Sequence, residues 1–272
     1  MEQKISTRLN NMTHSVEDIL PILKEASQKI MEVYHSFDPE KDITIKGDDS
    51  PLTRADKNSH EVIVAALQRL RPDIAILSEE NTEELVDRTS LEFLWCIDPL
   101  DGTKEFIKKK QDFCINIALL KNGKAIEGYV AVPAKNEFYW AVEGHGAFKE
   151  DAEGKRSEIK VKSFKASDKN LKIAASASHR NQETNDFIEV FEEPELKSMG
   201  SALKFLKIAE GEVDIYPRIA PTMEWDTAGP QIILEEAGGS VLHYETKQPL
   251  RYNKENLLNP YFIAIGGGEL SW

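Results

Sequence analysis

Apolar residues recur at helical spacing in two segments near the start of the chain. Between Ser15 and Phe37 the apolar positions fall on one face of a helix that Ser15 can cap. After a polar segment, residues 38–49, a second pattern predicts a helix from about Ala55 to Arg71. The chain therefore opens with two amphipathic helices.

Short apolar runs replace the helical pattern from residue 74 onward and predict β-strands. Residues 74–77 end at an acidic pair, and residues 93–97 end at Asp98. Three later runs predict an antiparallel meander over residues 114–120, 125–132 and 137–142. The Asn122-Gly123 pair between the first two of these runs is typical of a hairpin turn.

Strands and helices alternate in the second half of the chain. The pattern predicts strands at residues 172–176, 214–216, 240–243 and 262–265, and helices at 184–191, at 201–210 and after Asp226. Because these strands do not follow βαβ order, we expect an α/β (α+β) fold of layered sandwich type. A charged segment, residues 150–156, predicts a boundary between a half at 1–155 and a half at 156–272, with the active site at their junction.

Composition restricts the classes of function. The 272 residues are 40% hydrophobic and 30% charged, which is typical of a soluble globular protein. A formal charge of −13 argues against nucleic-acid polymers and anionic membranes as partners, and it means that a site for an anionic substrate needs bound cations.

Location can be addressed from three features of the sequence. No apolar stretch is long enough for a transmembrane helix, and the first eight residues do not form a secretory signal. The two cysteines, Cys96 and Cys114, do not form a C-x-x-C pair. We therefore expect a cytoplasmic protein.

Two aspartates after the predicted strand at residues 93–97 are the first candidates for chemistry. Asp98 and Asp101 lie three residues apart in a segment where Pro99 and Gly102 favour a sharp turn. Two carboxylates held this close repel each other unless a cation lies between them, and oxygen ligands suit magnesium. An Asx-type turn that ends the strand would explain the same spacing. The spacing alone therefore does not distinguish a metal site from a structural turn.

Other acidic residues lie in similar local positions. Glu79 follows a predicted strand, whereas Asp56 and Asp226 lie near predicted helix starts, and α/β proteins build sites for anionic ligands at such places. Each has an ordinary alternative: a solvated loop for Glu79, a first-turn acid for Asp56 and an N-cap for Asp226. Their occurrence together favours a metal site.

The motifs around these acids resemble those of the magnesium-dependent, lithium-sensitive inositol-monophosphatase superfamily. The likeness covers nearly the whole chain and rests on residues 95–106, Ser78-Glu79-Glu80, residues 53–56, 224–229 and 236–239. Within the superfamily the chain is most similar to the 3'(2'),5'-bisphosphate nucleotidases of the bacterial CysQ type. That similarity rests on Lys104-Glu105-Phe106 and on residues 176–179, 200–205, 209–211, 216–218 and 258–260.

The resemblance implies a fold and a set of site residues. The fold would be the layered αβαβα sandwich of these phosphatases. Two or three Mg²⁺ ions would be bound by Glu79, Asp98, the carbonyl of Leu100, Asp101 and Asp226. Catalysis would use Asp56, Glu79 and Thr103, with Thr103 and Asp56 orienting the attacking water. The substrate would be held by Gly102, Thr103, His179, Ser201, Lys204, Arg218 and Asp226.

The reaction implied by the resemblance is hydrolysis of the 3'-phosphate of adenosine 3',5'-bisphosphate to AMP and phosphate. A metal-activated water would attack without a covalent intermediate, which suits a very slow uncatalysed reaction. A phosphoaspartate route through Asp98 is the mechanistic alternative, although an aspartate that bridges metals is a poor nucleophile. Inositol or sugar phosphates are alternative substrates, and a binding protein without turnover is an alternative class.

Several expectations stay open at this point. Taken singly, His179, Lys204 and Arg218 would each also be explained as ordinary surface residues, and Lys108-Lys109-Lys110 is expected to be a solvated run. The family includes monomers and homodimers, and some relatives associate with the cytoplasmic face of the inner membrane. The sequence does not decide between these, or between adenosine 3',5'-bisphosphate and substrates with a 5'-phosphosulfate or a 2'-phosphate.

Overall fold

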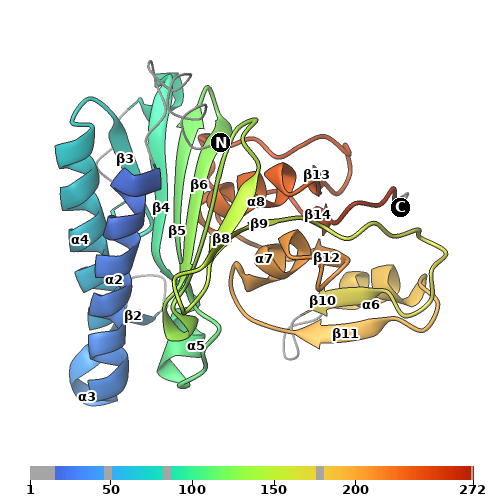
Figure 1. Cartoon of the computed structure of the whole chain (residues 1–272), viewed down its shortest axis with the longest axis horizontal. Helices are drawn as coiled ribbons and strands as arrows, with labels where there is room; N and C mark the ends of the chain where they lie inside the picture. The colour runs from blue at the N-terminus through green and yellow to red at the C-terminus, as the bar shows by residue number, and fades with distance from the viewer. Residues whose placement is uncertain (1–15, 46–50, 82–86, 176–180, 271) are drawn as a thin grey trace.

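Five layers make up the molecule, and two β-sheets are the second and fourth of them (Figure 1). The structure is a computed structural model that describes residues 16–45, 51–81, 87–175, 181–270 and 272. In order, the layers are a helix pair, a seven-stranded sheet, a second helix pair, a five-stranded sheet and a last helix. The predicted αβαβα sandwich is confirmed.

The seven-stranded sheet runs in the order β3-β4-β5-β6-β7-β8-β9, and only the β3–β4 pair is parallel. Its strands are β3 Ala75–Ser78, β4 Phe93–Asp101, β5 Cys114–Lys121, β6 Lys124–Val132, β7 Glu137–Val142, β8 Ala147–Glu150 and β9 Arg156–Ile159. Asn122 and Gly123 both have positive φ, 48° and 73°, as a two-residue hairpin turn between β5 and β6 requires. The predicted meander is confirmed.

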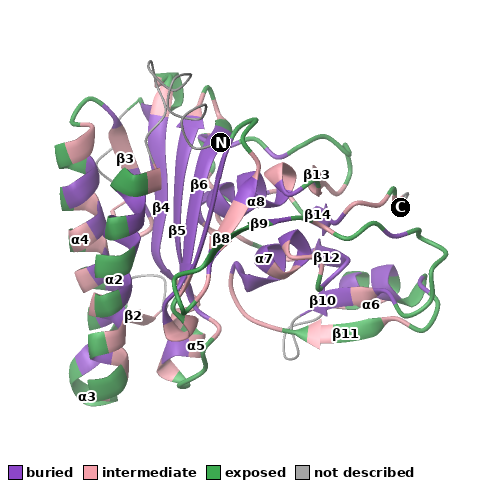
Figure 2. Cartoon of the chain, viewed as in Figure 1, coloured by how far each residue is buried: buried purple, intermediate pink, exposed green. Residues whose placement is uncertain are grey.

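Helices α2 (Val16–Ser36) and α4 (Arg54–Leu70) cover the outer face of this sheet (Figure 2). Side chains alternate across β4, so that Trp95 and Ile97 pack against these helices, whereas Leu94 and Cys96 face the opposite way. Burial on both faces explains why this strand reads as a continuous apolar run. The expected cap Ser15 lies outside the described residues.

The inner face of the sheet carries α7 (Leu203–Ala209) and α8 (Ala228–Glu236). Glycines let α8 approach the strands closely. A Cβ on Gly229 would lie 2.9 Å from the carbonyl oxygen of Ile117, and a Cβ on Gly128 of β6 would overlap the backbone of Gly229 and the side chain of Ile232. This backbone contact fixes the start of α8, just after Asp226, against the sheet.

The five-stranded sheet forms the fourth layer and mixes parallel and antiparallel pairs in the order β11-β10-β12-β14-β13. Its strands are β10 Lys172–Ala175, β11 Glu195–Ser198, β12 Ile215–Arg218, β13 Ser240–His243 and β14 Phe262–Ile265. Helix α6 (Gln182–Glu189) packs on its far face through Phe187 and Ile188, next to Ile173 and Ile215.

Short elements that the sequence pattern did not predict complete the fold. They are α3 Pro39–Asp42, β1 Ile43–Ile45, β2 Pro51–Thr53, α5 Thr103–Ile107 and the 3-10 helices η1 Arg88–Ser90, η2 Pro133–Lys135 and η3 Glu224–Asp226. Strands β8, β9 and β11 were also missed. All of them are too short to show a hydrophobic period.

Two expectations about segment ends need correction. The strand expected to stop before Asp98 continues to Asp101. The charged segment at residues 150–156 forms the turn of the β8–β9 hairpin, and the chain leaves the first sheet only after Ile159. Within the described ranges, no helix is both long and apolar enough to cross a membrane.

Gly128→Ala tests the close contact between β6 and α8. The added methyl group has no free volume, so the substitution should lower the free energy of unfolding by about 2–3 kcal/mol. Urea denaturation would measure the change. Stability equal to that of the wild type would show that α8 does not approach the sheet as closely as described.

Candidate active site

A bulge in β4 positions the first two candidate ligands. Asp98 pairs with Asn116 of β5 and Asp101 pairs with Cys114, so β4 has one more residue than β5 between these pairs. The two aspartates were expected in a turn after the strand, but they lie inside it because the bulge absorbs Pro99 without ending the ladder. Gly102 then turns the chain with φ at 96°.

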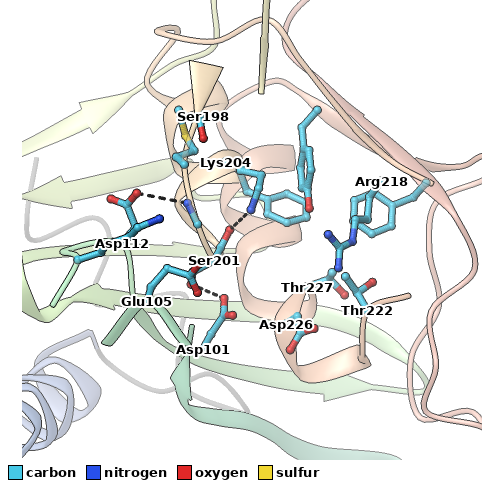
Figure 3. Close-up of a pocket in the computed structure, with 16 residues that line it drawn as sticks. Asp101, Glu105, Asp112, Ser198, Ser201, Lys204, Arg218, Thr222, Asp226 and Thr227 are labelled. Carbon is cyan, nitrogen blue, oxygen red and sulfur yellow. Dashed lines mark hydrogen bonds between the residues drawn. The ribbon is translucent and has the colours of Figure 1, made fainter. Parts of the chain in front are cut away.

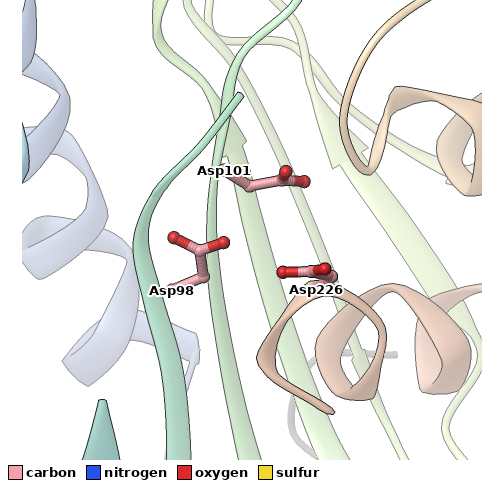
Figure 4. A group of neighbouring side chains, drawn as sticks. All are labelled: Asp98, Asp101 and Asp226. Atoms are coloured by element: carbon pink, nitrogen blue, oxygen red, sulfur yellow. The ribbon is translucent and has the colours of Figure 1, made fainter. Parts of the chain in front are cut away.

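Asp226 completes a group of three carboxylates (Figure 4). Asp98 and Asp101 come from β4, whereas Asp226 ends η3, just before α8, more than a hundred residues later in the chain. One oxygen of each of the three lies within 4.8 Å of the others, and Asp98 is only 1% exposed. Among the described residues, this aspartate trio is the group suited to a metal ion.

Burial and repulsion between neighbouring carboxylates raise the pKa values of Asp98 and Asp226. Burial, followed by the charges of Glu79, Asp101 and Asp226, raises the pKa of Asp98 well above its usual range. Burial and then Asp101 raise the pKa of Asp226 to about 8. A bound cation would reverse these shifts, and a donor set made only of oxygens fits a hard divalent ion such as magnesium.

Each carboxylate of the trio also has a structural hydrogen bond. Asp98 Oδ1 accepts from the backbone N of Leu100 at 3.0 Å, which is the Asx-type contact considered as an alternative. Asp226 Oδ2 accepts from the backbone N of Met223 at 3.0 Å, so Asp226 binds back into η3 and does not cap α8. Each of these bonds orients one oxygen, so the structural and the metal-binding explanations are compatible.

Glu79 lies next to the trio without being part of it. It follows β3, its backbone N donates to the carbonyl of Ile97 at 3.2 Å, and it is half-buried. Its charge contributes to the raised pKa values of Asp98 and Asp226, so its carboxylate is near both. The alternative of a solvated loop is wrong for this residue.

Buried Asp56 and half-buried Thr103 form a hydrogen-bonded unit beside the bulge. Thr53 caps α4, and its backbone N and hydroxyl both donate to Asp56 Oδ2, at 2.8 and 2.5 Å. Thr103 Oγ1 lies 3.0 Å from Asp56 Oδ1 and 3.3 Å from the carbonyl oxygen of Leu100, and its single proton can go to only one of them. Burial raises the pKa of Asp56 to about 6, against the effect of these hydrogen bonds.

A pocket opens next to the trio and contains two of the expected substrate-binding cations (Figure 3). Lys204 is 6% exposed, and its Nζ donates to the carbonyl of Ser201 at 3.0 Å and lies 5.0 Å from the centre of the Tyr216 ring. Arg218 of β12 donates to the carbonyl of Pro221 at 2.6 Å, while its Nε is buried without a partner. The alternative of a solvated lysine is therefore wrong for Lys204.

Asp101 also connects β4 to the turn before α7. Its Oδ2 accepts from the hydroxyl of Ser201 and, at 2.8 Å, from the backbone N of Ala202. Ser201 has φ at 52°, so it lies in a turn before α7, whereas the sequence placed it inside the helix. A Cβ on Gly200 would lie 2.8 Å from the carbonyl oxygen of Asp112, so a small residue is needed where the segments meet.

Several pocket residues were not predicted as site residues. Glu105, Lys110, Asp112, Thr222 and Thr227 all line the same pocket. Glu105 belongs to a motif that had been noted, but nothing in the local pattern separated Lys110 or Asp112 from solvated residues. His179, an expected substrate ligand, lies outside the described residues.

Glu224 is a further missed residue with a clear structural contact. It is fully buried, and its carboxylate accepts from the backbone N of Asn253 and, at 3.1 Å, from that of Lys254, whose ammonium also binds it. These contacts fix η3, the element that carries Asp226, to the segment before the last strand. In the sequence, the signal for a role of Glu224 was its position directly before Trp225-Asp226.

Comparisons with known proteins show which family the chain belongs to. The model of the inositol monophosphatase family matches residues 14–264. The 3'(2'),5'-bisphosphate nucleotidase CysQ of Escherichia coli (strain K12) is 39% identical over 248 residues, which cover 91% of this chain and 98% of the relative.

Two solved structures are similar to this chain over most of its length. CysQ from Bacteroides thetaiotaomicron is 39% identical, with a TM-score of 0.80 over 93% of this chain and 97% of that one. An IMPase from Thermotoga maritima is 26% identical, with a TM-score of 0.74 over 93% and 92%. With the family model matching most of its length, the chain belongs to the inositol monophosphatase family.

Proposed function

We propose that the chain is a magnesium-dependent phosphatase that removes the 3'-phosphate of adenosine 3',5'-bisphosphate and leaves AMP and phosphate. The observation that carries the proposal is the aspartate trio, two of whose members line a pocket that also contains Lys204 and Arg218. A metal cluster suits one phosphate, and two fixed cations suit a second one. The nucleotidases named CysQ, at 39% identity over nearly their full length, support the same substrate.

The metal ligands in this proposal are the trio, Glu79 and the carbonyl oxygen of Leu100, which together would hold two or three ions. When bound, divalent ions would supply positive charge against the phosphate oxygens and lower the pKa of a water. The raised pKa of Asp98 supports this assignment, because burying such a carboxylate is unfavourable unless a cation compensates it.

Thr103 and Asp56 would orient the attacking water. The Thr103 hydroxyl is held between Asp56 and the bulge carbonyl, so it can accept a hydrogen bond from a water while it donates to the carboxylate. Asp56 would then accept the proton that the attacking water loses, either relayed by the Thr103 hydroxyl or directly from the water. Gly102, through the backbone N–H groups that follow it, would contact phosphate oxygens.

Selection of the nucleotide would depend on the second half of the chain. Arg218 and Lys204 would pair with the 5'-phosphate, and both are held by backbone carbonyls before any ligand arrives. Ser201 and His179 would bind the ribose or a phosphate oxygen. An inositol monophosphate has no second anion for these cations, so this observation favours the bisphosphate.

Phosphate release from purified protein tests the substrate. We expect kcat/KM for adenosine 3',5'-bisphosphate to exceed that for inositol 1-phosphate by at least about tenfold, because only the nucleotide engages the two cations. Activity should require magnesium, disappear with a chelator and fall in lithium. A preference for inositol 1-phosphate would overturn the nucleotide assignment.

Asp98→Asn tests the metal site. The variant should keep less than about a tenth of the wild-type rate, because it loses the charge shared by the ions. Since the folded-state pKa of Asp98 is raised, its ionised form destabilises the fold at pH values above its unfolded pKa of about 3.9. The metal-free variant should therefore unfold at the same or a higher temperature than metal-free wild type at neutral pH.

Magnesium should raise the Tm of the wild type and not that of Asp98→Asn. Glu105→Gln is the control, because it removes a pocket carboxylate outside the trio and should keep the magnesium-induced rise. An equal rise in Asp98→Asn and wild type would exclude Asp98 as a ligand.

Thr103→Ala tests the water-orienting role. Losing the hydroxyl should lower kcat about 100-fold while the magnesium-induced rise in Tm is retained. Thr103→Ser, which keeps the hydroxyl, should recover most of the rate. A Thr103→Ala variant with nearly wild-type kcat would contradict the role.

A further inference from the structure

The three consecutive lysines at 108–110 were expected to be equivalent solvated residues, and the structure separates them. Lys110 lines the pocket that contains Lys204, Arg218 and two of the trio. Lys109 packs against α2 on the opposite side, and Lys108 is exposed and is not among the pocket residues. The run therefore contains one lysine with access to the substrate.

The backbone at Lys109 is held in an unusual conformation that turns the chain toward the pocket. Its φ is 57°, which is unfavourable for a residue with a side chain. Contacts with α2 and with the residue after it compensate. The Lys109 ammonium binds the carbonyl of Tyr34 and lies 4.5 Å from the ring centre of Tyr34 and 5.1 Å from that of Phe37. The Tyr34 hydroxyl oxygen lies 2.8 Å from the carbonyl oxygen of Lys109 and 3.3 Å from that of Lys110, and its single proton can go to only one of them.

The charges that line the pocket show what Lys110 can do there. Glu105, Asp112 and Lys110 line the same pocket, and they come from α5 and the segment directly after it. Asp112 is already engaged, since its Oδ2 accepts from the backbone N of Gly200 at 3.4 Å and its Oδ1 lies 4.0 Å from Lys135. In the described part of the chain, no hydrogen bond or ion pair involves the Lys110 ammonium. Without Lys110, this segment would present two carboxylates to an anionic substrate.

We propose that Lys110 is a specificity-determining residue that attracts the 5'-anionic group of the substrate at the pocket mouth and offsets the two carboxylates beside it. This inference rests on the proposed function. Lys204 is buried and bonded to a backbone carbonyl, so it provides fixed charge inside the pocket, whereas Lys110 is exposed and can meet the ligand on entry. Its effect should act on KM for substrates with a 5'-anion and leave kcat nearly unchanged.

A matched pair of charge reversals tests the proposal. Lys110→Glu and Lys108→Glu change the net charge equally and lie two residues apart, so a difference between them reports the position of the charge. For each protein, kcat and KM would be measured at low ionic strength with adenosine 3',5'-bisphosphate and with adenosine 3'-monophosphate. In Lys110→Glu, the kcat/KM ratio of bisphosphate to monophosphate should fall about five- to tenfold, through KM, whereas in Lys108→Glu it should change less than about twofold.

The outcomes separate this inference from the function on which it rests. If the wild type does not hydrolyse the bisphosphate, the proposed function fails and this inference fails with it. If the wild type is active but both variants change the ratio equally, or neither changes it, only the role of Lys110 is overturned. Unchanged Tm in both variants, together with loss of the effect at high salt, would exclude misfolding as the cause.

Discussion

Repulsion among closely spaced carboxylates is the interaction on which this structure depends. Asp98, Asp101 and Asp226 bring oxygens within 4.8 Å of one another, and Asp98 is almost fully buried. Without a cation, the pKa values of Asp98 and Asp226 rise because ionisation there is unfavourable. A fold that keeps such a cluster gives up stability that an apolar core would provide. The proposed function explains this loss, because binding of cations requires the carboxylates.

The surrounding structure holds the carboxylates in place against that repulsion. The β4 bulge, the η3 turn and the backbone donors at Leu100 and Met223 orient one oxygen each of Asp98 and Asp226. The close approach of α8 to β6 through Gly128 and Gly229 fixes the distance between the elements that carry them. The ligand geometry is therefore set by backbone contacts before any ion binds, which is what preorganisation requires.

Asp101 gives the site a second property, because it also binds the segment that starts α7. The carboxylate that would hold an ion accepts hydrogen bonds from Ser201 and Ala202, and Lys204 follows within one turn. The candidate metal site and the cationic part of the pocket are thus connected through the Asp101 side chain. A small displacement of one of these two parts should therefore displace the other. Gly200 allows the close contact between segments on which this connection depends.

The sequence by itself determined the elements with strong hydrophobic periods and the residues that carry motifs. The two N-terminal helices, the meander and the layered α/β class were all predictable because they depend on local spacing. The closeness of Asp98 and Asp101 could be predicted for the same reason, because they lie three residues apart. The proximity of Asp226 could be expected only from the family resemblance, since nothing in its neighbourhood indicates β4.

Tertiary structure alone decided the properties that depend on contacts between distant segments. It extends β4 through Pro99, because β5 continues the ladder past the bulge. It buries Lys204, which local spacing alone would explain as a surface lysine, and it turns Lys110 toward the pocket. The residue type determines whether a side chain is charged. Whether that charge faces water, a neighbouring ring or a ligand depends on which elements pack together.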